Sequence, residues 1–343
     1  MPNSNIRLII EKNIPFVKGL LDEYATVQYL APEEITAKAV RDIDGLVIRT
    51  RTICNEELLK RSECKLIATA TIGTDHIDLP YCASRSITAV NAPGCNAPAV
   101  AQYVLATLLQ VINRPLNSYT VGIIGLGHVG SIVERWLRGL DVKVLRCDPP
   151  RMRAEGGDDW VDMDTIAREA DIISVHTPLT MEGEDSTFHM LGDEFLGKLK
   201  RMPIIINTSR GAVADTRALI EASECGKTGP MIIDCWENEP EIDPELLRRA
   251  AVATPHIAGY SIEGKVRASQ VVMDAVSTFF MLPRVTVDAP LPPAPATGVS
   301  LSGVLASYNP MPESDALKAD PSRFEELRNN YVLRHEAPEG REH

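Results

Sequence analysis

Residues 119–131 read YTVGIIGLGHVGS. The first six form a mostly apolar run, which is typical of a buried β-strand. Gly125, Gly127 and Gly130 follow at the spacing G-x-G-x-x-G, and a helical pattern (SIVERWLRGL) begins directly after them. Glycines placed this way permit a tight turn, close approach of the backbone to a phosphate, and close packing of helix against strand. The stretch therefore predicts a nucleotide-binding α/β domain.

Short runs rich in β-branched residues lie on both sides of this stretch and alternate with helical patterns. The runs before it are 6–10, 27–30, 45–50, 66–70 and 86–91, and those after it are 142–148, 171–177, 203–209, 231–236 and 251–256. Strands that alternate with helices form parallel sheets, and continuously apolar strands belong to a sheet covered on both faces. The chain is predicted to be an α/β protein with two doubly wound parallel sheets.

Three further segments complete the predicted layout. The segment 97–112 is apolar on nearly all sides, so we expect a helix that a domain or subunit partner buries. From Pro283 the stretch PRVTVDAPLPPAPATG is rich in proline, which excludes regular helix and indicates a linker or an extended edge. A compact catalytic unit should end near residue 282, and 320–336 is predicted to form one amphipathic helix.

Composition and charge exclude several classes of protein. The 343 residues include 35 Lys and Arg against 47 Asp and Glu, for a formal net charge of −12. An acidic chain has no electrostatic reason to bind a phosphate backbone, so nucleic acid is not an expected partner. No run reaches the roughly 18 apolar residues of a membrane span, and the first residues do not resemble a signal peptide. We therefore expect a cytoplasmic protein that does not bind membranes.

The cysteines give no sign of a disulfide framework or a metal site. There are seven, at positions 54, 64, 82, 95, 147, 225 and 235, with no C-x-x-C pair and no histidine at zinc-ligand spacing. We predict reduced thiols, mostly buried, and no bound metal.

An acidic residue at the end of the next strand indicates the cofactor. Asp148 follows Gly130 at close to the spacing of about 20 residues used in dinucleotide-binding folds. A carboxylate there can accept hydrogen bonds from both ribose hydroxyls and would repel a 2′-phosphate, so NAD is predicted in preference to NADP. His128 is expected to be a solvent-facing spacer that acts through its backbone. The predicted cofactor-binding residues of this region are Gly125, Gly127, His128, Val129, Gly130 and Asp148.

The later strands end in polar clusters, which are HTPL (176–179), NTSRG (207–211), DCWENEP (234–240) and TPHIAGY (254–260). Carboxyl ends of parallel strands meet at one edge, where ligands bind, so these clusters should face one site. Arg210 suits two-point binding of a carboxylate, and His256 suits removal of a hydroxyl proton near neutral pH. Of two candidate acids, Asp234 and Glu239, the second would fix the tautomer of His256 and raise its pKa if it bonds the ring. The set is sufficient for an oxidoreductase acting on a hydroxy acid.

Simpler explanations exist for each of these residues. A single arginine is often a surface ion-pair partner and a single histidine is often structural. Trp236 is expected to serve packing, and His76 is expected to order its loop. His176 precedes a threonine-proline turn that explains its place, so we assign it no catalytic role.

With these residues in place, the chain resembles the D-isomer-specific 2-hydroxyacid dehydrogenases, and within them the branch that acts on erythronate 4-phosphate. The stretches that carry the resemblance to this branch are APGCNA (92–97), CDPPR (147–151), HTPL (176–179), DCWENEPE (234–241) and TPHIAGYSIEGK (254–265). The resemblance implies that Arg210, Glu239 and His256 are the catalytic residues, with His256 as proton acceptor. It also implies substrate contacts at Thr50, Thr71 and Tyr260, and NAD contacts at Asp148, Thr177, Asp234 and Gly259.

The resemblance also implies an architecture. Residues 1–94 and 258–282 would form a flavodoxin-like substrate or lid domain, and 95–257 a Rossmann NAD domain inserted between them. Residues 283–343 would form a small C-terminal dimerisation segment, so a homodimer is expected. The segment is shorter than is typical of this branch, and Gln102 stands where an acid is common.

The implied reaction is NAD-dependent oxidation of 4-phospho-D-erythronate at C2, a step toward pyridoxal 5′-phosphate. The substrate phosphate needs local cations, and Arg49 or Arg51 beside Thr50 is the predicted source, with Arg328 of a partner subunit as a further possibility. Two alternatives stay open: another 2-hydroxyacid dehydrogenase, such as one acting on phosphoglycerate, or a non-catalytic NAD-sensing protein.

Overall fold

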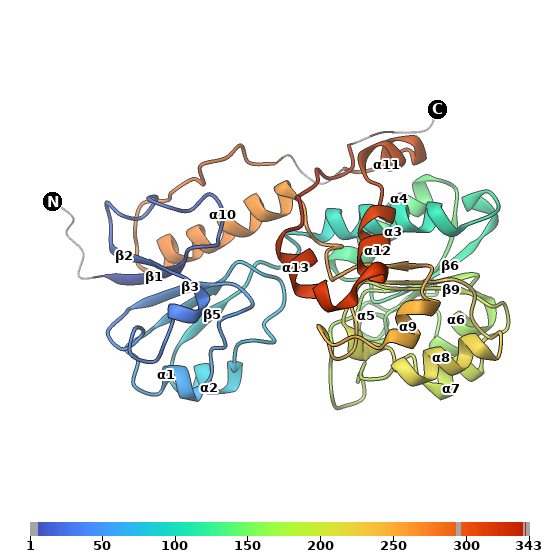
Figure 1. The fold of residues 1–343 in the computed structure, drawn as a ribbon, viewed down its shortest axis with the longest axis horizontal. Coiled ribbons are helices and arrows are strands. Elements are labelled where there is room, and N and C mark those ends of the chain that lie inside the picture. The colour runs from blue at the N-terminus through green and yellow to red at the C-terminus, as the bar shows by residue number, and fades with distance from the viewer. Residues whose placement is uncertain (1–5, 293–295, 339, 341–343) are drawn as a thin grey trace. The chain divides into compact units, whose positions relative to one another are not determined.

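The computed structural model describes residues 6–292, 296–338 and 340 and divides the chain into two compact units, each described separately below (Figure 1). The first unit takes its described residues from Met1–Asn96 and Ser261–Ala294, and the second from Ala97–Tyr260 and Pro295–His343. Residues 283–343, which we predicted to be one segment, are thus shared by the two units. The reason is packing: Val287 is buried in the core of the first unit, whereas the helices that follow pack in the second.

The first unit contains a five-stranded parallel sheet in the order β2-β1-β3-β4-β5. Its strands are β1 (Arg7–Glu11), β2 (Thr26–Leu30), β3 (Gly45–Ile48), β4 (Leu66–Thr69) and β5 (Thr88–Val90). Its helices are α1 (Glu56–Leu59), α2 (Leu79–Ser84), α10 (Ile262–Phe279) and the short 3-10 turn η1 (Pro32–Glu34). The strand order 2-1-3-4-5 is that of flavodoxin, as predicted.

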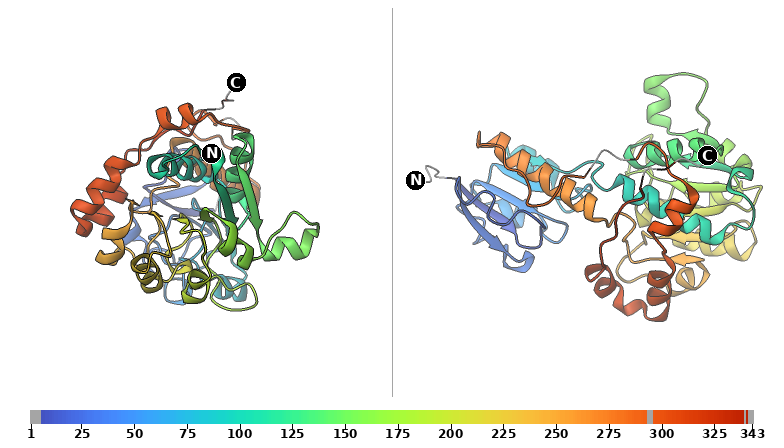
Figure 2. Two further views of the ribbon diagram at one scale, coloured as in Figure 1. Left: turned by 90° about the vertical axis from the view of Figure 1, so that its right-hand side faces the viewer. Right: turned by 90° about the horizontal axis from the view of Figure 1, so that it is seen from above.

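Alternate residues of the central strands face opposite layers of this unit. Leu8 and Ile10 of β1 pack with apolar residues of α10, and Ile9 between them packs with the layer around α1 and α2. Figure 2 shows the orange α10 lying along the blue strands, although it begins at Ile262 and the last strand of this sheet ends at Val90. Both faces of the sheet are therefore covered, which is why β3 and β4 are buried along their whole length.

The second unit contains a six-stranded parallel sheet in the order β11-β10-β9-β8-β6-β7. Its strands are β6 (Thr120–Ile124), β7 (Lys143–Cys147), β8 (Ile172–Val175), β9 (Ile204–Asn207), β10 (Met231–Ile233) and β11 (Val252–Ala253). A single parallel bridge from Arg146 to Trp160 extends the sheet beyond β7. The sequence order reverses between β6 and β8, and such a switch point is where open α/β sheets bind their ligands.

Helices cover both faces of this second sheet. They are α3 (Ala97–Val111), α4 (His128–Gly139), α5 (Pro149–Glu155), α6 (Met163–Glu169), α7 (Asp193–Gly197), α8 (Thr216–Glu224), α9 (Pro244–Arg249), α11 (Leu301–Ser307), α12 (Met311–Ala319) and α13 (Phe324–Asn329), with 3-10 turns η2 (Leu116–Ser118), η3 (Gly211–Val213) and η4 (Pro321–Arg323). Ile204 and Ile206 of β9 face the layer that contains α3 and α4, whereas Ile205 faces the layer of α6 to α9. The two doubly wound parallel sheets that we predicted are confirmed.

The prediction of one helix over 320–336 is wrong. A 3-10 turn starts at Pro321, α13 ends at Asn329, and the described residues that follow form no helix. The amphipathic pattern failed because the side chain of Arg334 is buried against loop carbonyls instead of lying on a solvated helix face. The helices α11 and α12 were not predicted.

Two smaller observations concern the thiols and the helices. None of the seven cysteines, all of which lie in the described part of the chain, forms a disulfide, and among them only Cys225 is exposed. Within the described part of the chain, no helix is long and apolar enough to cross a membrane.

Candidate active site

The glycine loop after β6 combines a tight turn with an exposed stretch of backbone at Gly127. Gly125 has a φ of +87°, a left-handed conformation that favours glycine. A Cβ on Gly130 would lie 2.0 Å from the Gly125 carbonyl oxygen, so helix α4 approaches the strand as closely as only glycine permits. A Cβ on Gly127, in contrast, would meet nothing within 4 Å. This open backbone at the first turn of α4 is a suitable cradle for a pyrophosphate.

Asp148 is tied to the glycine loop through its carboxylate. It accepts a hydrogen bond from the Leu126 amide (2.8 Å) and one from the Arg151 amide at the start of α5 (3.1 Å). The Arg151 guanidinium also bonds the Leu126 carbonyl and pairs with Glu155. The strand end and the loop are thus joined, which holds the predicted ribose-binding carboxylate beside the predicted phosphate cradle.

Thr177 supplies a polar group with no partner in the described residues. Its hydroxyl oxygen is buried without a hydrogen bond, and its methyl group lies close to Gly125. A buried hydroxyl without a partner carries an energetic cost that a bound ligand can relieve. The open Gly127 backbone, the adjacent Asp148 carboxylate and this hydroxyl together fit a bound dinucleotide. Of the other loop residues, His128 is exposed, as expected, and Val129 packs partly against the core.

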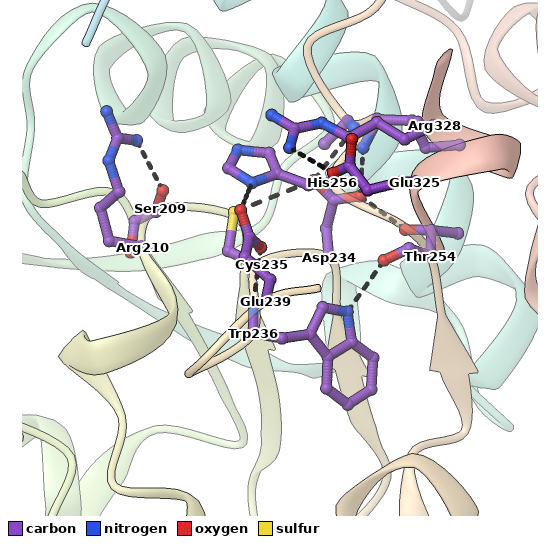
Figure 3. Close-up of polar contacts among 12 residues, drawn as sticks. Ser209, Arg210, Asp234, Cys235, Trp236, Glu239, Thr254, His256, Glu325 and Arg328 are labelled. Atoms are coloured by element: carbon purple, nitrogen blue, oxygen red, sulfur yellow. Dashed lines mark hydrogen bonds and ion pairs between the residues drawn. The ribbon is translucent and has the colours of Figure 1, made fainter. Parts of the chain in front are cut away.

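Glu239 and His256 are brought together by two loops at the carboxyl edge of the sheet. Glu239 Oε1 lies 2.6 Å from His256 Nδ1, and the Trp236 amide donates to the other carboxylate oxygen at 3.3 Å (Figure 3). A histidine whose Nδ1 is held by a carboxylate in this way can act as a proton acceptor through its other ring nitrogen.

The charges of this pair support each other. Burial disfavours the imidazolium, but contacts of the ring with Cys235 and Glu239 outweigh burial and raise the pKa of His256 well above its usual value. Burial would raise the pKa of Glu239, yet its hydrogen bond to His256 and the charge of Arg328 lower it. The pairing that we expected for Glu239 is therefore seen in the geometry.

Arg210 follows β9 and precedes η3. Its guanidinium donates to the Ser209 carbonyl at 2.8 Å, and Figure 3 shows the His256 ring pointing toward the side on which Arg210 stands. Gly211 lies against the Trp236 peptide, where a Cβ would come within 2.0 Å of the carbonyl group. This close contact brings the loop of Arg210 against the loop of Glu239. The sequence reasoning missed Gly211, although its place directly after Arg210 was a usable signal.

The side chain of Asp234 forms hydrogen bonds with the loop that contains His256. Only 1% of its surface is exposed, and its carboxylate accepts from the Thr254 hydroxyl (2.6 Å) and from the amides of Ile257 (2.8 Å) and Ala258 (3.0 Å). Burial raises the pKa of Asp234, although these hydrogen bonds and the charge of His256 oppose the shift. The side chain thus shapes the loop, and its predicted contact with NAD stays a prediction.

Two other predicted residues, Gly259 and Tyr260, lie after β11. Gly259 sits in the turn that follows His256, and the Tyr260 hydroxyl accepts a hydrogen bond from Arg328 Nε at 3.4 Å. Arg328 therefore lies beside Tyr260 of its own chain, whereas the sequence had led us to consider it for the site of a partner subunit. His176, which lies directly after β8, remains a neutral group, because burial lowers its pKa to about 3.

The remaining predicted residues belong to the first unit. The Thr71 hydroxyl bonds Thr69 (2.7 Å) and the Gly73 carbonyl (3.0 Å), and Thr69 also bonds His76 Nε2 (3.1 Å), so His76 helps to order this loop. Arg49 is half-buried and its Nε has no partner in the described residues, whereas Thr50 and Arg51 are exposed.

Known proteins resemble this chain over nearly its whole length. It is 43% identical to the erythronate-4-phosphate dehydrogenase of Bacteroides thetaiotaomicron, over 96% of this chain and 97% of that one. It is 39% identical to that of Porphyromonas gingivalis, over 95% and 92%. The chain belongs to the erythronate-4-phosphate dehydrogenase family.

The family match extends to the cofactor domain and to the fold. Residues 103–258 match the family described as D-isomer specific 2-hydroxyacid dehydrogenase, NAD binding domain, which confirms the predicted cofactor and enzyme class. Among solved structures, a D-lactate dehydrogenase from Aquifex aeolicus complexed with NAD and lactic acid has a TM-score of 0.68 and 26% identity, covering 81% of this chain and 96% of that one.

Proposed function

We propose that the protein oxidises 4-phospho-D-erythronate at C2 with NAD, giving (R)-3-hydroxy-2-oxo-4-phosphooxybutanoate for pyridoxal 5′-phosphate synthesis in the cytoplasm. The observation that carries the proposal is the pairing of Glu239 with His256 at 2.6 Å on the edge of the sheet that also bears Arg210. The names and coverage of the relatives support the choice of substrate.

His256 performs the proton transfer in this reaction. Its Nδ1 is held by Glu239, so Nε2 accepts the proton of the C2 hydroxyl as the carbon–hydrogen bond at C2 breaks. Bound NAD supplies the acceptor for the departing hydride, which carries both electrons. The imidazolium that forms is stabilised by the Glu239 carboxylate, in the same way as the third group of a hydrolase triad stabilises its histidine.

Arg210 binds and orients the substrate. Its planar guanidinium can engage the substrate carboxylate and the C2 oxygen together, which fixes the carbon that reacts and balances charge on the oxygen. Tyr260 and Thr71 are proposed as further substrate contacts. Arg49, with its buried Nε lacking a described partner, is the better of the two arginines proposed for the phosphate, although Arg51 stays a candidate.

The test is turnover by the purified protein. NADH formation should be measured with 4-phospho-D-erythronate, unphosphorylated erythronate, 3-phosphoglycerate and D-lactate, each with NAD and with NADP. We expect the highest kcat/KM for 4-phospho-D-erythronate with NAD. Preference for 3-phosphoglycerate would favour a sibling dehydrogenase, and NAD binding without turnover on any substrate would favour an NAD sensor.

A homodimer built through residues 283–343 is the second part of the proposal. In the second unit the C-terminal segment exposes Val332 (85%) and Leu305 (46%), apolar side chains that a partner subunit would cover. Light scattering of the purified protein tests this, and a monomer at micromolar concentration would refute it.

A further inference from the structure

Arg334, near the C-terminus, is buried among oxygen atoms of other segments. Only 8% of its surface is exposed. Its guanidinium donates to the carbonyls of Ile257 (3.2 Å), Tyr260 (3.0 Å) and Ala258, and to that of Ala99 at 3.0 Å. Most of these carbonyls belong to the loop that directly follows His256.

The same loop is held from its other side by Asp234. The amides of Ile257 and Ala258 donate to the Asp234 carboxylate, and the carbonyls of these two residues accept from Arg334. Two consecutive residues are thus bonded to a buried anion through their N–H groups and to a buried cation through their C=O groups, and the peptide between them is held at both its C=O and its N–H. Bonds to charged groups are stronger than bonds between neutral groups, so this arrangement fixes the orientation of the backbone at these two residues.

His256 needs such support because of its backbone. Its φ is +57°, in the left-handed region that residues other than glycine rarely adopt. A strained conformation of this kind persists only when the surrounding structure holds it in place. The loop 257–260, which the side chains of Asp234 and Arg334 hold from its two sides, begins at the very next residue.

Gln102 anchors Arg334 from helix α3. It is fully buried, and its Oε1 accepts from Arg334 Nε at 3.0 Å. Its amide nitrogen donates to the Ser307 hydroxyl (2.9 Å) and to the His335 carbonyl (3.0 Å). An acid at this position would lack these donors, which gives a physical reason for the amide. The ring of Tyr308 lies 4.2 Å from the guanidinium carbon and further stabilises the buried charge.

We propose that Arg334, held by Gln102, is a positioning residue that fixes the loop 257–260 and thereby aligns His256 with Glu239 for proton transfer. The proposal rests on the proposed function for its catalytic meaning. It assigns the C-terminal segment a role within its own chain that is separate from dimerisation.

The test compares Arg334→Lys with a matched control, Arg323→Ala. Arg323 lies on the same segment but is about half exposed and pairs only at the surface with Glu326. For Arg334→Lys we expect kcat to fall about tenfold or more, because an ammonium cannot bond the carbonyls on both sides, with KM for NAD changed far less. Arg323→Ala should have the same kcat and the same KM for NAD as the unsubstituted enzyme. Light scattering is recorded for each protein, so that the comparison is made at one oligomeric state.

A second readout needs no substrate and separates this proposal from the proposed function. The titration of His256 is followed by NMR of histidine-labelled protein, with His256→Gln used to assign the signal. The groups that face the ring, Glu239, Cys235 and Asp234, together with nearby Arg328, are unchanged in the variants. We expect the His256 titration to move to lower pH in Arg334→Lys, because the ring loses its alignment with Glu239.

Gln102→Glu provides a variant that keeps an acceptor for Arg334 and nearly the same volume, in case the lysine variant fails to fold. The carboxylate would draw the guanidinium toward α3 and weaken its bonds to the loop, so we expect the same changes to a smaller extent. A lower melting temperature with unchanged kcat and unchanged His256 titration, in whichever variant folds, would overturn the proposal. No turnover by the unsubstituted enzyme would instead reject the proposed function, and the titration would still decide the role of Arg334.

Discussion

The substitution Glu239→Gln measures how strongly Glu239 controls His256. The structure places the carboxylate 2.6 Å from Nδ1, and the pairing helps to raise the pKa of His256. Glutamine keeps an oxygen that can accept from Nδ1–H but removes the charge. A hydrogen bond to a charged group is worth about 1.5–3 kcal/mol against about 1 kcal/mol for a neutral one. Since one pKa unit corresponds to about 1.4 kcal/mol, the His256 pKa should fall by about one unit.

The sign of the effect on activity follows from the role of His256. In the oxidation direction the ring must be neutral to accept a proton, so activity rises with pH through the pKa of His256. Glu239→Gln should move this rising limb to lower pH, while the maximal rate falls because a less basic ring is a weaker acceptor. In the reduction direction the protonated form is needed, and activity should be lost at a lower pH than in the unsubstituted enzyme.

The assay is kcat/KM against pH in both directions. Glu237→Gln serves as the control, because Glu237 makes the same kind of contact, also at 2.6 Å, to His189, which is not among the candidate site residues. An unchanged rising limb in Glu239→Gln, or an equal shift in Glu237→Gln, would refute the reasoning.

Five further substitutions test other parts of the site. The unsubstituted enzyme should prefer NAD over NADP by at least about 100-fold in kcat/KM, and equal values for the two cofactors would contradict the role of Asp148. Asp148→Ala should reduce this preference, because it removes the hydrogen bonds to the ribose and the repulsion of a 2′-phosphate. Arg210→Lys should lower kcat/KM by more than about tenfold, since an ammonium cannot bind at two points, and near-normal activity would place Arg210 outside the site. Arg49→Ala and Arg51→Ala should be compared on phosphorylated and unphosphorylated erythronate, where a phosphate contact predicts a loss confined to the phosphorylated substrate and equal losses would reject it. Gly211→Ala should abolish activity or folding, because its Cβ would lie 2.0 Å from the Trp236 carbonyl group, and a fully active variant would show that the loops are not in contact.

The strands and the glycine loop could be predicted from the sequence because their causes are local. A parallel strand that is buried on both faces needs a continuous apolar run. Each apolar run that we predicted to be a strand from residue 119 onward contains an observed strand. The requirement for glycine at positions 125 and 130 is likewise a matter of backbone conformation and space at one turn. The strand-end location of Arg210, Glu239 and His256 followed from the topology of a parallel sheet.

The roles of individual polar side chains could not be predicted in the same way. Asp234 and Glu239 were both candidate acids, and only the structure shows that one clamps the loop while the other bonds the histidine. The positions of Asp234 and Glu239 in the sequence are compatible with either one as the partner of His256. What separates them is the direction in which each side chain points after the loop has folded.

By itself the sequence determined the α/β class, the nucleotide cradle and the edge of the sheet that carries the chemistry, because periodicity, glycine spacing and strand order act over short distances or follow from chain topology. Only the tertiary structure decided that 330–338 is not helical and that Arg334 meets Gln102, its partner 232 positions away. Such a contact depends on how distant segments pack, and a buried charge must be matched to oxygen atoms that no local pattern specifies.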